Sequence, residues 1–344
     1  MIDLRSDTFT HPTQSMRDAM ATAEVGDDVF QEDPTIQKLE ALSAKKTGKE
    51  AALFVPSGTM GNLISVLSHC SRGDEILLGD RCHISLYEVG GVSALGGVHP
   101  RTLPNNCDGT ITLDLLEKGI RHSDIHSPST RLICLENTHN FCQGSPLSPD
   151  YMTSVADLAQ NYGLKIHLDG ARVFNAAVAL KVPVAKLTEK VDSVMFCLSK
   201  GLSAPVGSLV CGSSDFIDKA RKMRKMVGGG MRQAGHLAAA GLVALQELVN
   251  RLQEDHENAK ILARGIATLE GIELDETRVK TNIIFFNLTG MEGKKFIDQL
   301  DKKQIKLLMT GVETFRAVLH REVSKKQVQI VIETIRAILE KRSG

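Results

Sequence analysis

The sequence predicts a two-domain α/β protein, with a mostly parallel central sheet in a large domain and a small α+β domain at the C-terminal end. Short apolar segments alternate with amphipathic helices over residues 50–213, which is typical of a parallel sheet covered by helices. The 344 residues exceed what one hydrophobic core usually supports. Beyond residue 270 the pattern changes to a mixture of strand pairs and helices. We therefore assign residues 15–250 to the large domain, and residues 1–14 and 251–344 to the small one.

Periodicity and turn residues place the elements in order. Two helices are expected at 11–26 and 33–48, because apolar residues recur at helical spacing and each pattern ends on a glycine. In the large domain, strands are then expected within 50–58, 74–80, 96–104, 131–140, 164–172, 191–201 and 207–213, and helices at 59–70, 84–95, 112–120 and 150–163. A long helix or helix pair at 232–269 follows, and the small domain is expected to hold strands within 281–290, 305–311 and 314–321, and helices at 293–303 and 325–342.

The composition excludes several classes of function. Lys+Arg and Asp+Glu both number 41, so a broad surface for nucleic acid or acidic membranes is not expected. Aromatic residues make up 4% and there is no Trp, which argues against a stacking platform for single strands. No apolar window is long enough to span a membrane, and the first residues do not resemble a signal peptide. We expect a cytoplasmic protein, or a mitochondrial one if a transit peptide has been removed.

The seven cysteines predict reduced thiols rather than disulfides or a metal centre. They form no C-x-x-C pair, their number is odd, and several lie in apolar runs, which fits a reducing compartment. His122 and His126 have the spacing of metal ligands on a helix, but Ser-Asp between them and Pro128 after them argue against a helix there. The sequence therefore assigns no metal.

A lysine and an aspartate end two buried strands. Lys200 follows the apolar run "VMFCLS", and Asp169 follows "KIHL". Considered alone, Asp169 can be explained as a helix N-cap or as part of an internal salt bridge. Together, a desolvated lysine and a carboxylate on neighbouring strand ends are what pyridoxal 5′-phosphate (PLP) requires, because the amine forms the Schiff base and the acid keeps the ring nitrogen protonated.

A candidate phosphate-binding turn lies in "PSGTMGN", between a strand and a helix. The amides of Gly58, Thr59 and Met60 can point from the helix N-terminus at a dianion, with the hydroxyls of Ser57 and Thr59 assisting. The alternative is a capped helix without a ligand. Neither a Walker loop nor G-x-G-x-x-G is present here, which argues against P-loop and dinucleotide sites.

Two histidines are placed near the expected ligand edge of the sheet. His83 follows the strand "EILL", where an imidazole can stack on a flat cofactor ring. His126 lies in a loop before the strand "RLICLE", and we expect it to reach the same opening. Either histidine can instead be purely structural.

The chain resembles the low-specificity L-threonine aldolase family of the PLP-dependent fold type I (aspartate aminotransferase-like) superfamily. The motifs that carry the resemblance run nearly end to end: "IDLRSDT", "EVGDDV", "EDPT", "EAALFVPSGTMGN", "HLDGAR", "SVMFCLSKGL", "APVGS" and "GGGMRQAG". The resemblance implies a PLP-dependent transferase-like fold with PLP as cofactor. It also implies a homotetramer, a dimer of dimers, with shared active sites.

The resemblance also implies roles for residues whose motifs match. Lys200 would be the Schiff-base lysine, Asp169 would bind the pyridine nitrogen, and His83 would stack on the ring. Gly58 and Thr59, with Ser57, would bind the phosphate. The residues expected to contact the substrate, mostly at its carboxylate or hydroxyl, are Ser6, Tyr87, His126, Arg172 and Arg316. Arg172 would also lie near the cofactor, and Lys225 and Arg232 would reach the site of a neighbouring subunit.

Five positions depart from the family pattern. Phe30 and Gln31 stand where a Tyr-Gly pair is usual, and Ser85, Leu86 and Ser127 stand where aromatic residues are usual. We expect these positions to flank the pocket. The loss of an aromatic wall there would relax selectivity for the β-substituent, with phenylserine cleaved at least as well as L-threonine.

The implied activity is retro-aldol cleavage of L-threonine, L-allo-threonine and related β-hydroxy-α-amino acids to glycine and an aldehyde. Two alternatives stay open. One is another PLP reaction on the same fold: β-elimination, racemisation or transamination of a β-hydroxy or aromatic amino acid. The other is a scaffold that has lost its cofactor, against which the retained Lys200 and Asp169 argue.

Overall fold

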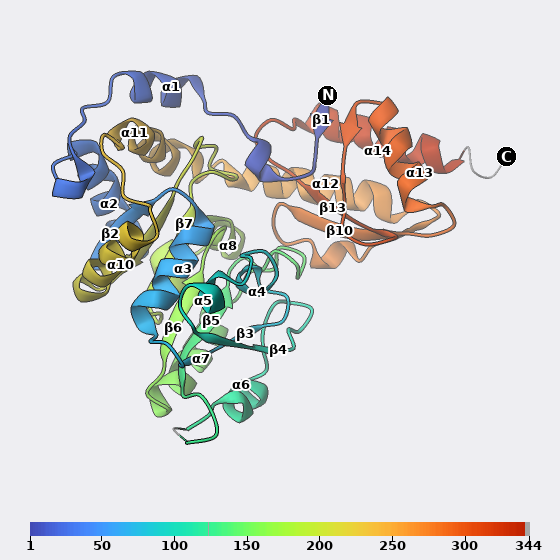
Figure 1. The fold of residues 1–344 in the computed structure, drawn as a ribbon. Helices are drawn as coiled ribbons and strands as arrows, with labels where there is room; N and C mark the ends of the chain where they lie inside the picture. The colour runs from blue at the N-terminus through green and yellow to red at the C-terminus, as the bar shows by residue number, and fades with distance from the viewer. Residues whose placement is uncertain (123, 341–344) are drawn as a thin grey trace.

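A seven-stranded sheet forms the centre of the large domain in the computed structural model, which describes residues 1–122 and 124–340 (Figure 1). The strands run in the order β2 (Ala51–Val55), β8 (Ser208–Gly212), β7 (Ser193–Cys197), β6 (Lys165–Asp169), β5 (Thr130–Glu136), β3 (Glu75–Gly79) and β4 (His99–Leu103). β8 is antiparallel to both its neighbours, and all the other pairs are parallel. The predicted fold class is therefore confirmed.

Alternate side chains of this sheet belong to two different apolar layers. Leu168 and Phe196 pack with α2 (Pro34–Thr47), α7 (Pro149–Asn161), α8 (Val173–Leu180) and α11 (Gly235–Val243). Met195 and Val210 pack with α3 (Gly58–His69) and α10 (Ser214–Met226) on the opposite face. Because side chains alternate along a strand, β6 turns Asp169 toward the α3 face while Leu168 enters the other core.

The small domain combines an antiparallel sheet with three helices. Its sheet has the order β12 (Leu308–Met309), β13 (Thr314–Val318), β10 (Ile283–Leu288) and β9 (Ile272–Glu273), and its helices are α12 (Leu252–Ala267), α13 (Gly293–Lys302) and α14 (Lys325–Glu340). The chain begins here, since β1 (Ile2–Asp3) pairs with β11 (Ile305–Lys306), and then crosses to the large domain (Figure 1). Ile2 and Leu4 enter the same apolar cluster as α12 and α14. This cluster supports the predicted domain division, which stays a prediction.

The remaining elements are short. They are α1 (Gln14–Ala21), α4 (His83–Leu86), α5 (Gly91–Ala94), α6 (Leu113–Gly119), α9 (Val184–Thr188), a π-helix (Ala244–Leu248) and 3-10 turns at Asp7–Phe9, Asp28–Phe30 and Glu276–Arg278. The helix predicted at 84–95 is split, because Val89 and Gly90 have left-handed φ values of 56° and 65°. The sequence reading missed α8, α9 and α10. The last residues of the predicted final helix, Lys341 and Arg342, lie outside the described residues.

One buried carboxylate joins two helices of the large domain. Asp33 caps α2 by accepting hydrogen bonds from the amides of Thr35 and Ile36 at 3.1 and 3.0 Å. It also accepts one from the amide of Gly235, the first residue of α11, at 2.8 Å. A β-carbon on Gly235 would collide with this carboxylate, so the close approach requires glycine there.

Five of the seven cysteines are buried, as expected of core thiols. Within the described residues, no helix is both long enough and apolar enough to cross a membrane.

Asp33→Ala should lower the free energy of unfolding by about 2–3 kcal/mol, because it removes a helix cap and leaves the buried Gly235 amide without a partner. The measurement is urea denaturation of both proteins. Asp275→Ala is the matched control, since Asp275 caps an exposed 3-10 turn through Thr277. Equal effects of the two substitutions would show that the Asp33–Gly235 contact does not stabilise the fold.

Candidate active site

A cavity of about 380 Å³ lies at the carboxyl ends of the sheet strands, where β13 of the small domain also contributes. Several stretches of the large domain meet there: the turn between β2 and α3, the segment around α4, the ends of β5 and β6 with the residues that follow them, and the end of β7 with its following loop. The expected site residues that line the cavity are Ser6, Ser57, Gly58, Thr59, His83, Tyr87, Asp169, Arg172, Lys200 and Arg316. The topology therefore brings together side chains that are far apart in the sequence.

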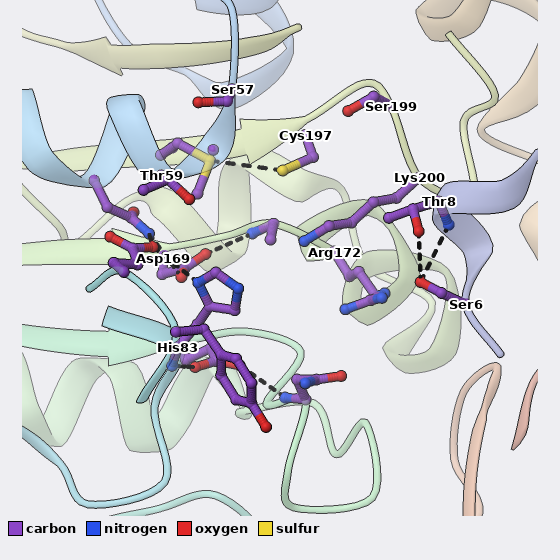
Figure 2. Close-up of a pocket in the computed structure, with 18 of the residues that line it drawn as sticks. Ser6, Thr8, Ser57, Thr59, His83, Asp169, Arg172, Cys197, Ser199 and Lys200 are labelled. Carbon is purple, nitrogen blue, oxygen red and sulfur yellow. Dashed lines mark hydrogen bonds and ion pairs between the residues drawn. The ribbon is translucent and has the colours of Figure 1, made fainter. Parts of the chain in front are cut away.

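Lys200 extends into the middle of this cavity (Figure 2). Its backbone is held in place, since its carbonyl oxygen accepts from Thr10 Oγ1 at 2.9 Å and from the Ser203 amide at 2.8 Å. Within the described part of the chain, nothing forms a hydrogen bond or ion pair with its amine. The lysine is thus fixed at its base and free at its reactive nitrogen, which suits a nucleophile better than a solvated strand end.

Asp169 is a buried carboxylate without a cationic partner. It is 2% exposed, and it accepts hydrogen bonds from Asn62 Nδ2 at 2.9 Å and the Ala171 amide at 3.0 Å. No lysine, arginine or histidine of the described residues forms an ion pair with it. A buried charge that lacks a partner of opposite sign is costly. The cavity therefore suits a ligand that presents a cationic N–H at this point, such as a protonated pyridine ring.

The turn before α3 can hold a phosphate, with one correction to the predicted donors. Ser57 caps the helix, and its Oγ accepts from the Met60 amide at 3.2 Å, so that amide is not available to a ligand. The amides of Gly58 and Thr59 have no partner among the described residues, and they point from the positive end of the helix dipole. A β-carbon on Gly58 would lie 2.9 Å from Cys197 Sγ, which explains the glycine.

Arg172 forms a bidentate pair with Asp7, a residue to which the sequence reading gave no role. Nε and Nη2 of Arg172 donate to the two carboxylate oxygens at 2.8 and 2.7 Å, and both side chains are buried. Burial raises the pKa of Asp7, but the charge and hydrogen bonds of Arg172 outweigh it and hold that pKa far below its usual value. Because two of its nitrogens already donate to Asp7, Arg172 has only some of its N–H groups left to bind a ligand.

Arg316, in contrast, has no carboxylate partner among the described residues. It is 9% exposed, and its two terminal nitrogens donate to Asn140 Oδ1 and to the Arg5 carbonyl, both at 3.0 Å. Its Nε has no partner, and burial lowers its pKa to about 10. A buried guanidinium of this kind favours the binding of a carboxylate ligand.

His83 is oriented by two acids that the sequence reading missed. Its Nδ1 lies 2.8 Å from Glu88 Oε1, and its amide donates to Glu136 Oε2 at 2.7 Å. Burial lowers the pKa of His83, but the hydrogen bond from Glu88 and the charges of Asp169 and Glu88 raise it overall. Burial also raises the pKa of Glu88. Nε2 of His83 forms no hydrogen bond with any described residue.

The aromatic wall of the cavity comes from residues other than those expected. Tyr87 stacks between His83 and Phe141, with ring centroids at 5.6 and 5.4 Å. None of the five departing positions, Phe30, Gln31, Ser85, Leu86 and Ser127, lines the cavity of this chain. Phe30 and Leu86 are instead exposed side chains. The expectation that the pocket lacks an aromatic wall is therefore wrong for the single chain, and the altered selectivity inferred from it loses its support.

Three predicted site residues lie outside the cavity. His126 is exposed in a turn bridged by Asp124 and Ser127, before β5 begins. A loop before a parallel strand lies at the amino edge of the sheet, opposite the carboxyl edge where the cavity opens, so the expectation for His126 was wrong within one chain. Arg232 pairs with Asp27 at 3.0 Å, and Lys225 lies exposed in the last turn of α10.

His83, Glu88 and Asp169 also offer ligand atoms within 4.8 Å of one another, a spacing that a metal ion could use. Two of these residues already share a hydrogen bond, and Asn62 Nδ2 donates to both carboxylates. We interpret the trio as a hydrogen-bonded cluster that serves the cavity.

Comparisons with known proteins place these features in a family. The β-eliminating lyase family matches residues 3–289. "Low-specificity L-threonine aldolase 1" of Arabidopsis thaliana is 51% identical over 96% of this chain and 94% of its own length, and the low specificity L-threonine aldolase of Escherichia coli K12 is 43% identical over 98% and 99%. A solved threonine aldolase structure from Leishmania major superposes with a TM-score of 0.85 at 20% identity, over 98% of this chain and 100% of that one. The last comparison concerns the fold alone.

Asp7→Asn should lower the free energy of unfolding by about 3 kcal/mol at pH 7, because Arg172 would stay buried without its counter-charge. The Asp7 pKa is lower in the folded protein than in the unfolded chain. The stabilisation is therefore complete above the unfolded pKa, and the difference between the two proteins should narrow as the pH falls below about 4.

Denaturation at several pH values tests this, with Asp114→Asn as control, since Asp114 forms an exposed pair with Lys118. A pH-independent difference for Asp7→Asn would contradict the charge-pair explanation.

Proposed function

The chain belongs to the low-specificity L-threonine aldolases of the β-eliminating lyase family, and from this premise we propose that it cleaves L-threonine, L-allo-threonine and related β-hydroxy-α-amino acids to glycine and an aldehyde. It is a carbon–carbon lyase of PLP fold type I, with PLP as its cofactor. The observation that carries the proposal is that two buried ionisable side chains line one cavity and neither forms an ion pair with a described residue. They are the carboxylate of Asp169 and the guanidinium of Arg316. One suits a protonated ring nitrogen, and the other suits the carboxylate of an amino acid.

Bound PLP supplies an electron sink for the bond that breaks at Cα. The residues proposed to hold it follow from the geometry. Asp169 would accept from the ring N–H, the amides of Gly58 and Thr59 with the hydroxyl of Ser57 would receive the phosphate, and Lys200 would form the covalent link to the aldehyde carbon. His83 would lie against the ring.

The substrate carboxylate would bind Arg316, with Ser6 and the remaining donors of Arg172 beside it. Anchoring that carboxylate sets the rotation about Cα and hence which bond is perpendicular to the cofactor ring. Selection of the Cα–Cβ bond is thus assigned to the carboxylate site.

Cleavage also requires a group that accepts the proton of the β-hydroxyl. With His126 outside the cavity, the free Nε2 of His83 is the base that we propose. Glu88 supports this role because it holds Nδ1 and orients the ring. Tyr87, stacked on His83, would then contact the substrate side chain.

A homotetramer, assembled as a dimer of dimers with shared sites, is our proposal for the oligomeric state. Large apolar side chains are exposed on the surface, among them Phe30, Leu86, Val89 and Met226. The outward direction of Lys225 and Arg232 suits a role in a neighbouring subunit's site. For the compartment we propose the cytoplasm, or mitochondria as the alternative, because buried free thiols persist in reducing surroundings.

A second candidate reaction is β-elimination, which the name of the matched family describes. The same cavity would support it if a base removed the Cα proton and the β-substituent then left Cβ, with the Cα–Cβ bond kept intact. A product assay on L-threonine, L-allo-threonine and phenylserine separates the two. Glycine plus an aldehyde supports the proposed function, whereas a keto acid plus ammonia supports elimination.

Lys200→Ala should abolish turnover by a factor of about 10³ or more while the fold is retained. Its bound PLP should no longer be fixed to the chain by borohydride, whereas the wild-type protein should carry the label on Lys200. Lys190→Ala, on an exposed lysine that pairs only with Glu189, is the control and should behave as wild type. Wild-type turnover by Lys200→Ala without an added amine would disprove the assignment.

Arg316→Lys should raise KM for L-threonine about 10- to 100-fold and change kcat less, because an ammonium replaces a forked guanidinium at the carboxylate site. Steady-state kinetics measure this. Arg321→Lys is the neighbouring control, since Arg321 donates to the His11 carbonyl and pairs with Glu322. An unchanged KM for Arg316→Lys would place the substrate carboxylate elsewhere.

A further inference from the structure

A chain of polar side chains, buried except for the half-buried His69, runs between α3 and the sheet and ends at Asp169 and Glu88. His69 Nε2 lies 2.8 Å from Ser193 Oγ, which lies 2.9 Å from His167 Nδ1. His167 Nε2 lies 3.1 Å from Asn62 Oδ1. The Nδ2 group of Asn62 then donates to Asp169 Oδ2 at 2.9 Å and to Glu88 Oε1 at 2.8 Å. Asn62, Asp169 and Glu88 line the cavity, whereas His69, Ser193 and His167 lie behind them.

The secondary structure explains why these side chains meet. Asn62 and His69 are seven residues apart on α3, so they lie on the same face two turns apart. His167 and Asp169 are two residues apart on β6, so their side chains point to the same face of the sheet. Ser193 of β7 is the ladder partner of His167. The polar chain therefore occupies the seam between α3 and the sheet, with Phe216 stacked on His69 at its far end.

The direction of every hydrogen bond in this chain follows from its two carboxylates. Ionised carboxylates only accept, so the amide of Asn62 must turn its NH₂ group toward them and its oxygen toward His167. His167 Nε2 then carries the proton and Nδ1 accepts from the Ser193 hydroxyl, whose oxygen accepts from His69 Nε2–H. Burial lowers the pKa of His167 to about 3 and that of His69 to about 4, which keeps both rings neutral. All donors thus point toward the acid end.

We propose that Asn62 is a positioning residue: its single amide holds Asp169 toward the ring nitrogen of the bound cofactor and holds Glu88 against His83, and the neutral chain behind it fixes the orientation of that amide. The inference rests on the proposed use of PLP. It assigns a role to a neutral residue that would form neither a covalent bond nor an ion pair with the cofactor or the substrate. It also couples Asp169, the acid that would meet the ring nitrogen, to the histidine proposed as the base.

The physical reason lies in the alternatives open to Asp169 and Glu88. Both are at most 4% exposed, and Asn62 is fully buried, so water cannot replace the amide. If the amide turned over, its oxygen would face two carboxylates and its NH₂ would face the Nε2–H of His167. That arrangement loses every hydrogen bond of the group at once, so the neutral chain allows only one orientation.

The test uses Asn62→Ala in the holoenzyme. Loss of two charge-assisted hydrogen bonds should weaken PLP binding about 10-fold or more, measured by equilibrium dialysis. The visible absorption band of the bound cofactor should also change its pH dependence, because Asp169 would no longer be held against the ring nitrogen. Asn258→Ala is the matched control, since Asn258 is a buried asparagine that donates to the Val323 carbonyl in the small domain. Wild-type PLP affinity and an unchanged pH dependence in Asn62→Ala would overturn the proposal.

A milder pair of variants keeps the proposal testable if Asn62→Ala fails to fold. Ser193→Ala removes the hydroxyl that donates to His167 Nδ1, whereas Ser208→Ala removes a buried hydroxyl of the same sheet that has no partner among the described residues. Ser193→Ala should shift the pH dependence of the cofactor band and weaken PLP binding about 3-fold, and Ser208→Ala should do neither. Identical behaviour of the two serine variants would contradict the positioning role.

These readouts do not depend on which amino acid is cleaved. A chain that binds PLP through Asn62 as described but yields keto acid from L-threonine would disprove the proposed function and leave the positioning role in place. If the wild-type protein produces glycine and Asn62→Ala binds PLP with wild-type affinity, the proposed function stands and the positioning role is disproved.

Discussion

The buried carboxylate of Asp169, which has no cation beside it among the described residues, is the constraint from which the site follows. The end of β6 places it at the carboxyl edge of a parallel sheet, and the alternation of the strand turns it toward α3. The side-chain amide of Asn62 and the backbone N–H of Ala171 donate to it, and a cationic ring nitrogen is the partner that we propose in addition. Lys200 lies in the loop that follows the neighbouring strand β7, and its amine extends into the same cavity, where we propose that it forms the covalent link to the cofactor.

Arg316, which has no carboxylate partner among the described residues, comes from β13, so strands of both sheets contribute to the cavity. The N-terminal segment secures this arrangement. It begins in the sheet of the small domain, and Asp7 then pairs with Arg172 of the large one. That pair gives Arg172 a carboxylate partner, whereas Arg316 has none among the described residues, so two neighbouring guanidinium groups are left with different bonding needs. Arg316 is therefore the one that we propose for the substrate carboxylate.

Strand-end residues were predictable from the sequence because their placement depends on local pattern alone. Lys200, Asp169 and Ser57 each follow a short apolar run, and the ends of parallel strands share one edge. Glu88, Asp7 and Asn140 were not found, since their roles come from contacts between distant segments and none ends a strand. The spacing of Asn62 and His69, seven residues apart on one helix, predicts that both lie on the same face of that helix. The sequence does not show which face of the sheet this helix packs against, so their partners could not be predicted. His126 does not reach the cavity of its own chain, because its loop precedes β5 instead of following it.

The protonation state of the cofactor ring nitrogen tests the central claim most directly. It can be measured from the ¹⁵N chemical shift of ¹⁵N-labelled PLP bound to the intact protein between pH 6 and 9. If Asp169 is an unpaired carboxylate that requires a cation, the nitrogen should stay protonated across the whole range. A neutral ring nitrogen, or one that titrates as in the free cofactor, would contradict it.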